Sequence, residues 1–125
     1  MSKPFYVKVE TPKELQDAAY EALQIANRTG DVRKGTNETT KAIERAQAKL
    51  VVIAENVEPP EVVAHLPILC EERKIPYVFV ADKAKIGSAI GIDVPSAAAS
   101  ITEAGDAAGL LKEIVTRLEA TRKAA

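Results

Sequence analysis

The sequence predicts an α/β protein, a single-domain three-layer α/β/α sandwich with a small mixed sheet of about four strands, formed by residues 1–125 as one domain. Helical patterns alternate with β-rich runs along the chain, which is the order expected when helices cover both faces of a sheet. Two runs, Leu50–Ala54 and Tyr77–Val80, are uninterrupted and apolar, as is typical of central strands buried on both faces. The chain has 125 residues and 46% hydrophobic content, which is enough for one packed core.

The first predicted helix begins at Thr11-Pro12 and ends at Gly30. A threonine before a proline is typical of an N-cap followed by the first helical position, and glycine commonly ends a helix. Between them, apolar residues repeat at helical spacing: Leu15, Ala18, Ala19, Ala22, Leu23 and Ala26. Residues Asp31–Lys34 then form a short connection that could also be an edge strand.

A second helix is expected to begin at Thr36 or Asn37, either of which can be its N-cap, and to run to about Ala48. At about 100° per residue, one side of this helix is polar. That side carries Asn37, Glu38, Lys41 and Arg45. The other side carries Ala42, Ile43 and Ala46, which we expect to pack inward.

The second half of the chain continues the alternation. A helix over Glu61–Arg73 is expected to break or kink at Pro67, because proline lacks a backbone N–H. The remaining elements are a short helix capped by Asp82 and ending at Gly91, a loop over 92–96, a smaller strand over Ala97–Ile101, and a final helix over Asp106–Arg122 with Leu110, Leu111, Ile114, Val115 and Leu118 facing inward.

Composition limits the possible functions. The net charge is −1, so any nucleic-acid binding must come from a local patch rather than a general basic field. The single cysteine, Cys70, excludes an internal disulfide, and its apolar neighbours Ile68 and Leu69 predict a buried, unreactive thiol. Residues Met1–Lys8 lack the apolar core of a signal peptide, and no apolar run reaches the ~20 residues of a membrane span. We therefore expect a soluble, cytoplasmic protein.

The sequence offers little for catalysis or for cofactor binding. His65 is the only histidine, and its spacing from Cys70 does not match a metal site, so we expect it to be a helix residue near the core. The stretch Gly87–Gly91 lies within and at the end of a predicted helix, not in a phosphate-binding loop after a strand. We expect neither an enzyme nor a bound cofactor.

The stretch Lys34–Lys41 is the best candidate for a functional site. A carboxylate, an amide and an ammonium group would project together from the start of a helix, where free N–H groups and the helix dipole favour anions such as phosphates. The alternative is an ordinary helix start, in which Glu38 and Lys41 form a common surface pair three residues apart.

Five stretches, in this order and spacing, closely resemble the archaeal large-subunit members of the ribosomal L7Ae family. They are Gly35–Lys41, Leu50–Glu55, His65–Glu72, Ile75–Tyr77 and Ile86–Gly91. The resemblance extends from about Thr11 to Leu118. It implies an RNA-binding protein of the kink-turn class that acts in the ribosome, in box C/D and H/ACA guide ribonucleoproteins and in archaeal ribonuclease P.

The resemblance also implies roles for individual residues. A kink-turn carries tandem sheared G·A pairs, in which the guanine N1–H and O6 remain free. Glu38 would accept from N1–H, while Lys41 and Asn37 would donate to O6. Arg33 and Lys34 would meet phosphates, and Gly35 and Thr36 belong to the same RNA-binding stretch.

By the same resemblance, a second surface holds an extruded bulge nucleotide. Its matching positions are Glu58, Val62, Lys83, Ile92, Asp93, Val94 and Pro95. Eukaryotic relatives carry arginine where Val94 stands, and an apolar residue there is similar to the archaeal proteins, which tolerate more RNAs. Alternatively, Glu58 is a solvated loop residue, Val62 a core contact and Lys83 a first-turn surface charge.

The implied partners are kink-turn RNAs, namely large-subunit rRNA, box C/D and H/ACA guide RNAs and ribonuclease P RNA, together with the proteins that assemble on guide RNAs. We expect no membrane association and a monomer when free. The alternative function is a protein-interaction domain of the same fold without RNA binding. A small-metabolite enzyme is a third hypothesis, disfavoured because a phosphate loop, a metal cluster and a candidate base are missing from the sequence.

Overall fold

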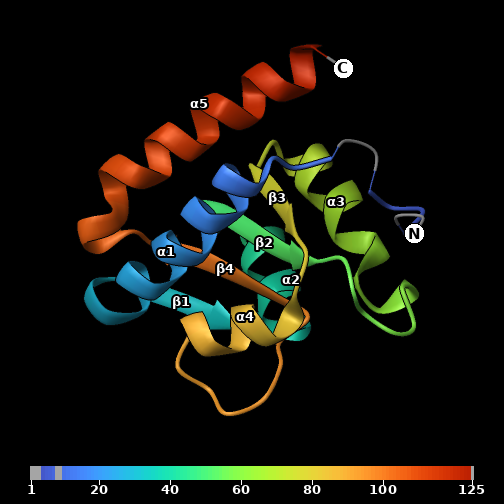
Figure 1. Cartoon of the computed structure of the whole chain (residues 1–125), viewed down its shortest axis with the longest axis horizontal. Helices are drawn as coiled ribbons and strands as arrows, with labels where there is room; N and C mark the ends of the chain where they lie inside the picture. The colour runs from blue at the N-terminus through green and yellow to red at the C-terminus, as the bar shows by residue number, and fades with distance from the viewer. Residues whose placement is uncertain (1–3, 8–9, 125) are drawn as a thin grey trace.

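The computed structural model describes residues 4–7 and 10–124 and contains one four-stranded sheet flanked by helices (Figure 1). The elements in chain order are α1 (Lys13–Thr29), β1 (Asp31–Lys34), α2 (Thr36–Glu44), β2 (Leu50–Ala54), α3 (Glu61–Arg73), β3 (Tyr77–Val80), α4 (Lys83–Ala89), β4 (Ala98–Glu103), the 3₁₀ turn η1 (Gly105–Ala107) and α5 (Ala108–Ala124). The predicted α/β class with a small mixed sheet is confirmed.

The strand order is β1-β4-β2-β3. Strand β4 runs antiparallel to both β1 and β2, whereas β2 and β3 are parallel. It follows that β1, β2 and β3 finish at the same end of the sheet, where β4 begins. We call this the loop end; it comprises the segments 34–36, 55–60, 81–83 and 92–97.

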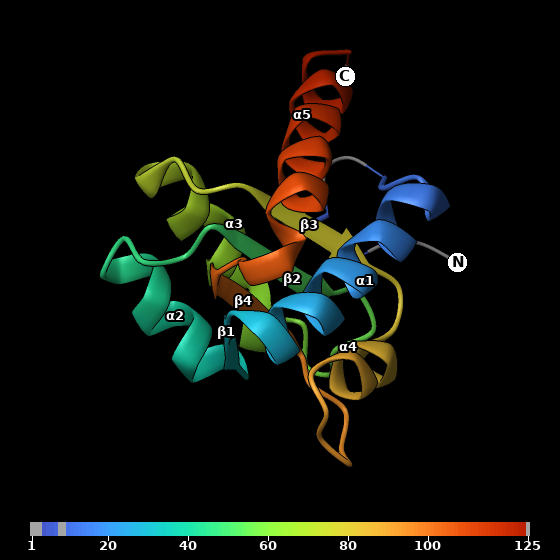
Figure 2. The same ribbon diagram turned by 90° about the vertical axis from the view of Figure 1, so that its left-hand side faces the viewer.

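Helices form a layer on each face of the sheet. Figure 2 shows α2 and α3 on one side and α1 and α4 on the other, and α5 packs against α1. Every residue of β2 is fully buried, and the side chains of β3 are at most 9% exposed. The predicted three-layer arrangement and the burial of both strands are confirmed. The prediction that both are central was wrong: β3 lies at the edge of the described sheet, and β4 and β2 are the inner strands. An apolar run indicates that helices cover both faces of a strand, and it does not indicate how many strands pair with it.

Helix α2 is shorter than predicted. It ends at Glu44, with Arg45 as its C-cap, instead of near Ala48. Ala46 adopts a left-handed conformation with φ 57°, and the amides of Gln47 and Ala48 turn back to donate to the Ala42 carbonyl. This reversal leaves Ala46 exposed, so its predicted inward packing was wrong.

Several other local predictions also need correction. Helix α3 continues through the buried Pro67 without a break. Pro12, not Thr11, is the N-cap of α1, and Gly35, not Thr36 or Asn37, is the N-cap of α2. His65 is exposed, because it lies on the side of α3 away from the sheet, and is not near the core.

The last third of the chain differs in extent from its prediction. Strand β4 is not a small strand: it has six residues and lies between β1 and β2. The final helix begins after η1 and buries Ile114 and Leu118, while Leu110, Leu111 and Val115 are only half-buried. Three local predictions made for earlier parts of the chain are confirmed. Gly30 is the C-cap of α1, Asp82 is the N-cap of α4, and the thiol of Cys70 is buried.

Tyr6 ties the N-terminal segment to the loop end. Its hydroxyl donates to the Ala54 carbonyl over 2.8 Å, and its ring lies 5.7 Å from that of Phe79. Burial and, to a smaller extent, the nearby carboxylates Glu55 and Glu58 together raise the pKa of Tyr6 to about 12. The neutral phenol is thus the form that the fold stabilises.

We predict that this phenol makes stability fall at high pH. The folded pKa is above the ordinary value, so the contribution is complete below pH 10 and is lost as pH rises toward 12. The free energy of unfolding of the wild type, measured relative to that of Tyr6→Phe, should fall by about 1 kcal/mol between about pH 8 and about pH 11. Urea unfolding of both proteins at both pH values measures this. A difference that stays constant would contradict it.

The loop between α4 and β4, which projects at the bottom of Figure 1, rests directly on Gly87 of α4. The Ile92 amide donates to the Gly87 carbonyl over 3.0 Å. A Cβ on Gly87 would overlap the carbonyl oxygen of Val94, which is a backbone atom and cannot rotate away. The close approach of helix and loop therefore requires glycine.

We predict that Gly87→Ala destabilises the fold by about 2–3 kcal/mol, because the loop must move to admit the methyl group. Gly109→Ala is the matched control: it too lies in a helix, but its Cβ would meet nothing within 4 Å. The control should be neutral or stabilising by up to about 1 kcal/mol. Equal denaturation midpoints for the two variants would show that the loop does not rest on Gly87.

Candidate functional site

The passage from β1 to α2 takes a single residue, Gly35, which adopts φ 94°. This conformation favours glycine because a Cβ is strained there. The Gly35 amide donates to the Ala98 carbonyl, and its own carbonyl accepts from the Thr39 amide, both over 3.0 Å. Gly35 thereby fixes the start of α2 to the first residue of β4.

Helix α2 has a buried side and a polar side. Thr39, Ala42 and Ile43 are buried against the sheet and α3. Asn37 and Lys41 are exposed and Glu38 is half-buried, so the structure brings the three predicted polar groups together. Lys41 Nζ lies 3.3 Å from Glu38 Oε2, and both side chains are about half exposed. An exposed pair of this kind is weak and can be exchanged for contacts with a ligand.

The two basic residues before Gly35 lie at the edge of the sheet. Arg33 and Lys34 are both exposed on β1, the edge strand that the sequence suggested. Arg33 Nε lies 3.3 Å from an Asp31 carboxylate oxygen, which also accepts a 2.6 Å hydrogen bond from Thr102. The site therefore presents two cations beside the start of α2, one of them oriented by Asp31.

The second predicted group lies at the same loop end. Glu58 is exposed in the β2–α3 connection, and Val62 is 42% exposed on α3, so Val62 is not the core contact of the alternative interpretation. Lys83 begins α4 and is half-buried. Its amide donates to Asn56 Oδ1 over 2.9 Å, and its carbonyl accepts from the Ser96 amide over 3.0 Å. The Lys83 backbone thus joins the β2–α3 and α4–β4 loops.

The α4–β4 loop offers an apolar surface. Ile92 is half-buried, whereas Asp93, Val94 and Pro95 are exposed, Val94 by 62%. An exposed valine in an anchored loop is available for contact with a ligand. The Gly35 amide donates to the Ala98 carbonyl and the Ala54 amide to the Ala97 carbonyl, so the chain that follows this loop is bonded to the ends of both neighbouring strands. The two predicted groups therefore share one framework.

Three residues that position this end of the sheet were not recognised from the sequence, namely Tyr20, Gln16 and Asn56. The Tyr20 hydroxyl accepts from the Asp82 amide and donates to its carbonyl, and Gln16 accepts from the Ala81 amide. Asn56 donates to the Asp82 carboxylate, which caps α4 by accepting from Ala84. Burial raises the pKa of Tyr20, so it keeps its donor hydrogen. Only Asp82 had a local signal, as a helix N-cap; the other partners lie 26 to 65 residues away.

Within the described residues, histidine, cysteine and carboxylate side chains form no group of three able to hold a metal ion. In the same part of the chain, every helix is too short or too polar to cross a membrane.

Comparison with known proteins places this chain in a family. Residues 17–111 match the model of the ribosomal protein L7Ae/L30e/S12e/Gadd45 family. The fold is also similar to that of a solved structure from Giardia lamblia, the 15.5kD RNA binding protein, with a TM-score of 0.88 and 31% sequence identity. That similarity covers 94% of this chain and 98% of the Giardia chain. The protein described here therefore belongs to the ribosomal protein L7Ae/L30e/S12e/Gadd45 family.

Proposed function

We propose that this protein, as a single domain over residues 1–125, is a non-catalytic RNA-binding protein that recognises kink-turn and kink-loop motifs through tandem sheared G·A pairs. One observation carries the proposal: Asn37, Glu38 and Lys41 meet on the exposed side of α2 at the loop end. Membership of the family and the similarity to the Giardia RNA binding protein support it.

The chemistry of a sheared G·A pair suits these three side chains. The guanine pairs through its sugar edge, so its N1–H donor and O6 acceptor face outward. A carboxylate such as Glu38 accepts from N1–H, while the ammonium of Lys41 and the amide of Asn37 donate to O6. The Lys41–Glu38 contact of 3.3 Å would open to make these bonds. The sharp bend of a kink-turn admits a helix end that ordinary A-form RNA excludes.

Backbone contacts would orient the RNA on this helix. Arg33 and Lys34 are exposed next to Gly35 and can each neutralise a phosphate. The first turn of α2, beginning at Thr36, adds N–H groups that have no partner within the helix. These contacts give affinity without reading sequence, so the choice of RNA remains with Asn37, Glu38 and Lys41.

The rest of the loop end would hold the extruded nucleotide of the bulge. Val94 and Val62 offer exposed apolar contact, and Pro95 adds a rigid neighbour. Lys83 and Glu58 can make polar contacts from the two loops on either side. Ile92 and Asp93 complete the α4–β4 loop. A mainly apolar surface of this kind contacts a nucleotide by shape and does not select one base through hydrogen bonds.

We further propose that the RNA targets are large-subunit rRNA, box C/D and H/ACA guide RNAs and the RNA of ribonuclease P, and that guide-ribonucleoprotein proteins assemble on the complex. The sequence resemblance to archaeal family members supports these assignments. We also propose that the protein is cytoplasmic and that it is a monomer when free.

We predict that Glu38→Ala and Lys41→Ala each weaken binding to a kink-turn RNA by about 1–3 kcal/mol, the range for a good direct base contact. Gel shifts with a kink-turn and with a version lacking the G·A pairs measure this. Glu44→Ala, on the same helix, and Lys112→Ala, on α5, are charge-matched controls on exposed residues.

Failure of the wild type to distinguish the two RNAs would remove kink-turn recognition from the proposal. If the protein binds neither RNA, the protein-interaction domain becomes the better hypothesis. If Lys112→Ala weakens binding as much as Lys41→Ala, while Glu38→Ala and Glu44→Ala both strengthen it, the contact is general electrostatics and not base recognition.

We also predict that Val94→Arg narrows the range of RNAs bound more than it changes the affinity for the best one. The substitution adds a charged donor to an exposed apolar loop, and specificity is a difference between affinities. A panel of kink-turns and kink-loops that differ only in the bulge and terminal loop tests this. An equal shift for every RNA, or none, would show that this loop does not set RNA choice.

A further inference from the structure

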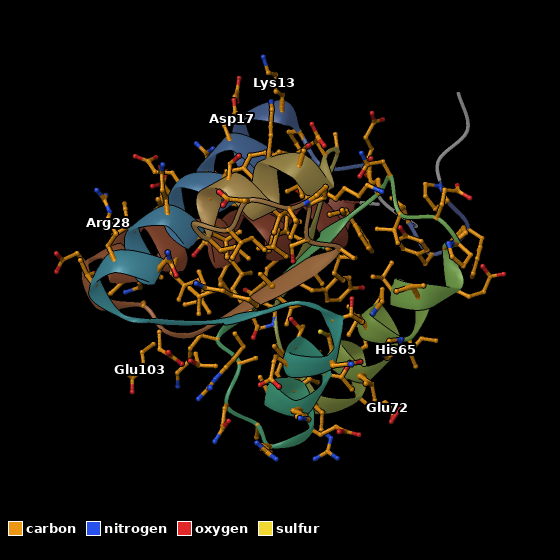
Figure 3. All side chains as sticks on the ribbon, turned by 90° about the horizontal axis from the view of Figure 1, so that it is seen from below. Lys13, Asp17, Arg28, His65, Glu72 and Glu103 are labelled. Carbon is orange, nitrogen blue, oxygen red and sulfur yellow. The ribbon has the colours of Figure 1, made fainter. Side chains whose placement is uncertain are left out.

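A hydrogen-bonded chain links α3 to the first turns of α2. Thr40 Oγ1 donates to the Thr36 carbonyl over 2.8 Å and lies 3.0 Å from His65 Nε2. Figure 3 shows His65 on α3 beside α2. Thr36 is the first residue of α2, so the chain ends at the helix start that carries Asn37 and Glu38.

The hydroxyl of Thr40 has only one hydrogen, and this fixes the direction of the chain. Because that hydrogen is used on the Thr36 carbonyl, Thr40 Oγ1 is the acceptor toward His65. Both bonds can coexist only when His65 Nε2 carries a hydrogen and donates. The chain then runs in one sense, from His65 through Thr40 to Thr36, and each bond polarises the next.

The Gly35 amide attaches the start of α2 to β4 at one point, and a further contact is needed to fix the orientation of the helix. It has nine residues, its N-cap is a glycine, and no side chain caps its first amides. Helices this short are marginal without tertiary contacts. The buried stripe of Thr39, Ala42 and Ile43 attaches one side of the helix. On that side, only packing opposes rotation of α2 about its axis.

Thr40 is placed to oppose that rotation. At about 100° per residue it lies between the buried side and the side that carries Asn37 and Lys41. Its half-buried state agrees with a position on this flank. A bond from α3 to this flank holds the helix at a second point, away from the buried stripe. Recognition groups must be held within about 10–20° of their productive orientation, so a small rotation matters.

We propose that His65 is a positioning residue for RNA recognition: by donating to Thr40 it fixes the orientation of the first two turns of α2, and with them Asn37, Glu38 and Lys41. This inference rests on the RNA-binding function proposed above. His65 does not touch the RNA in this scheme; it acts through Thr40. A purely structural role is the competing interpretation, in which the bond adds stability and leaves affinity unchanged.

Five variants test the inference. His65→Leu and Thr40→Val remove the bond while keeping a side chain of similar size. His65→Gln and Thr40→Ser keep a donor and a hydroxyl, respectively, and should rescue. Glu72→Gln is the control: it is exposed, lies on the same side of α3 two turns later, and is marked in Figure 3.

The first measurement needs no RNA. Native-state hydrogen exchange of the Thr39, Thr40 and Lys41 amides reports local opening of the α2 start. Loss of one partly exposed hydrogen bond should speed their exchange about threefold in His65→Leu, and at least as much in Thr40→Val, which also loses the bond to the Thr36 carbonyl. His65→Gln, Thr40→Ser and Glu72→Gln should exchange like the wild type. Unchanged exchange in His65→Leu would overturn the inference whether or not the protein binds RNA.

The second measurement is affinity for a kink-turn RNA, at a temperature where every variant is fully folded. His65→Leu should bind about threefold more weakly. Thr40→Val, which also loses the bond to the Thr36 carbonyl, should lose at least as much, and the double variant should be no weaker than Thr40→Val alone. Additive losses in the double variant, or faster exchange with unchanged affinity, would overturn the positioning role. A wild type that binds no kink-turn would instead refute the proposed function, since the exchange result stands separately.

Discussion

The antiparallel entry of β4 between β1 and β2 is the constraint on which the rest of the molecule depends. Because β4 begins where its neighbours end, the Ala98 carbonyl can accept from Gly35 and the Ala97 carbonyl from Ala54. Those two bonds bring the start of α2 and the α4–β4 loop to one end of the sheet. The segments that carry Asn37 and Val94, which are far apart in the sequence, are thereby attached to the same end of the sheet.

The chemistry of the site was easier to predict than its support. Asn37, Glu38 and Lys41 lie within one turn of helix, so their common side follows from helical spacing alone. The supports are long-range: Asn56 reaches Lys83 across 27 residues and Tyr20 reaches Asp82 across 62. Nothing in the local sequence marks such partners, because any polar side chain could occupy those positions.

The errors in the predicted fold have the same origin. Alanine favours helix, so Ala46 gave no sign of the left-handed conformation that ends α2; the burial of neighbouring Ala42 and Ala48 decides it. The small residues Ala98, Ala99 and Ser100 are weak strand formers, so the sequence predicted only a small strand there. Their small size instead suits a strand covered on both faces by helices. Pro67 is tolerated in α3 because packing against the core outweighs one lost hydrogen bond.

If the site binds RNA as proposed, the net charge of −1 bears on how the protein selects its RNA. A broad basic field would bind any phosphate backbone, whereas here Glu38 stands among the cations Arg33, Lys34 and Lys41. A carboxylate repels phosphates and is satisfied only by a donor, so it penalises RNAs that offer none at that place. In the free protein its pairing with Lys41 over 3.3 Å keeps both groups solvated and exchangeable. In the proposed function, selectivity for the RNA therefore has two sources of similar importance. Glu38 repels the phosphates of ordinary RNA, and the polar side of α2 bonds to the G·A pairs.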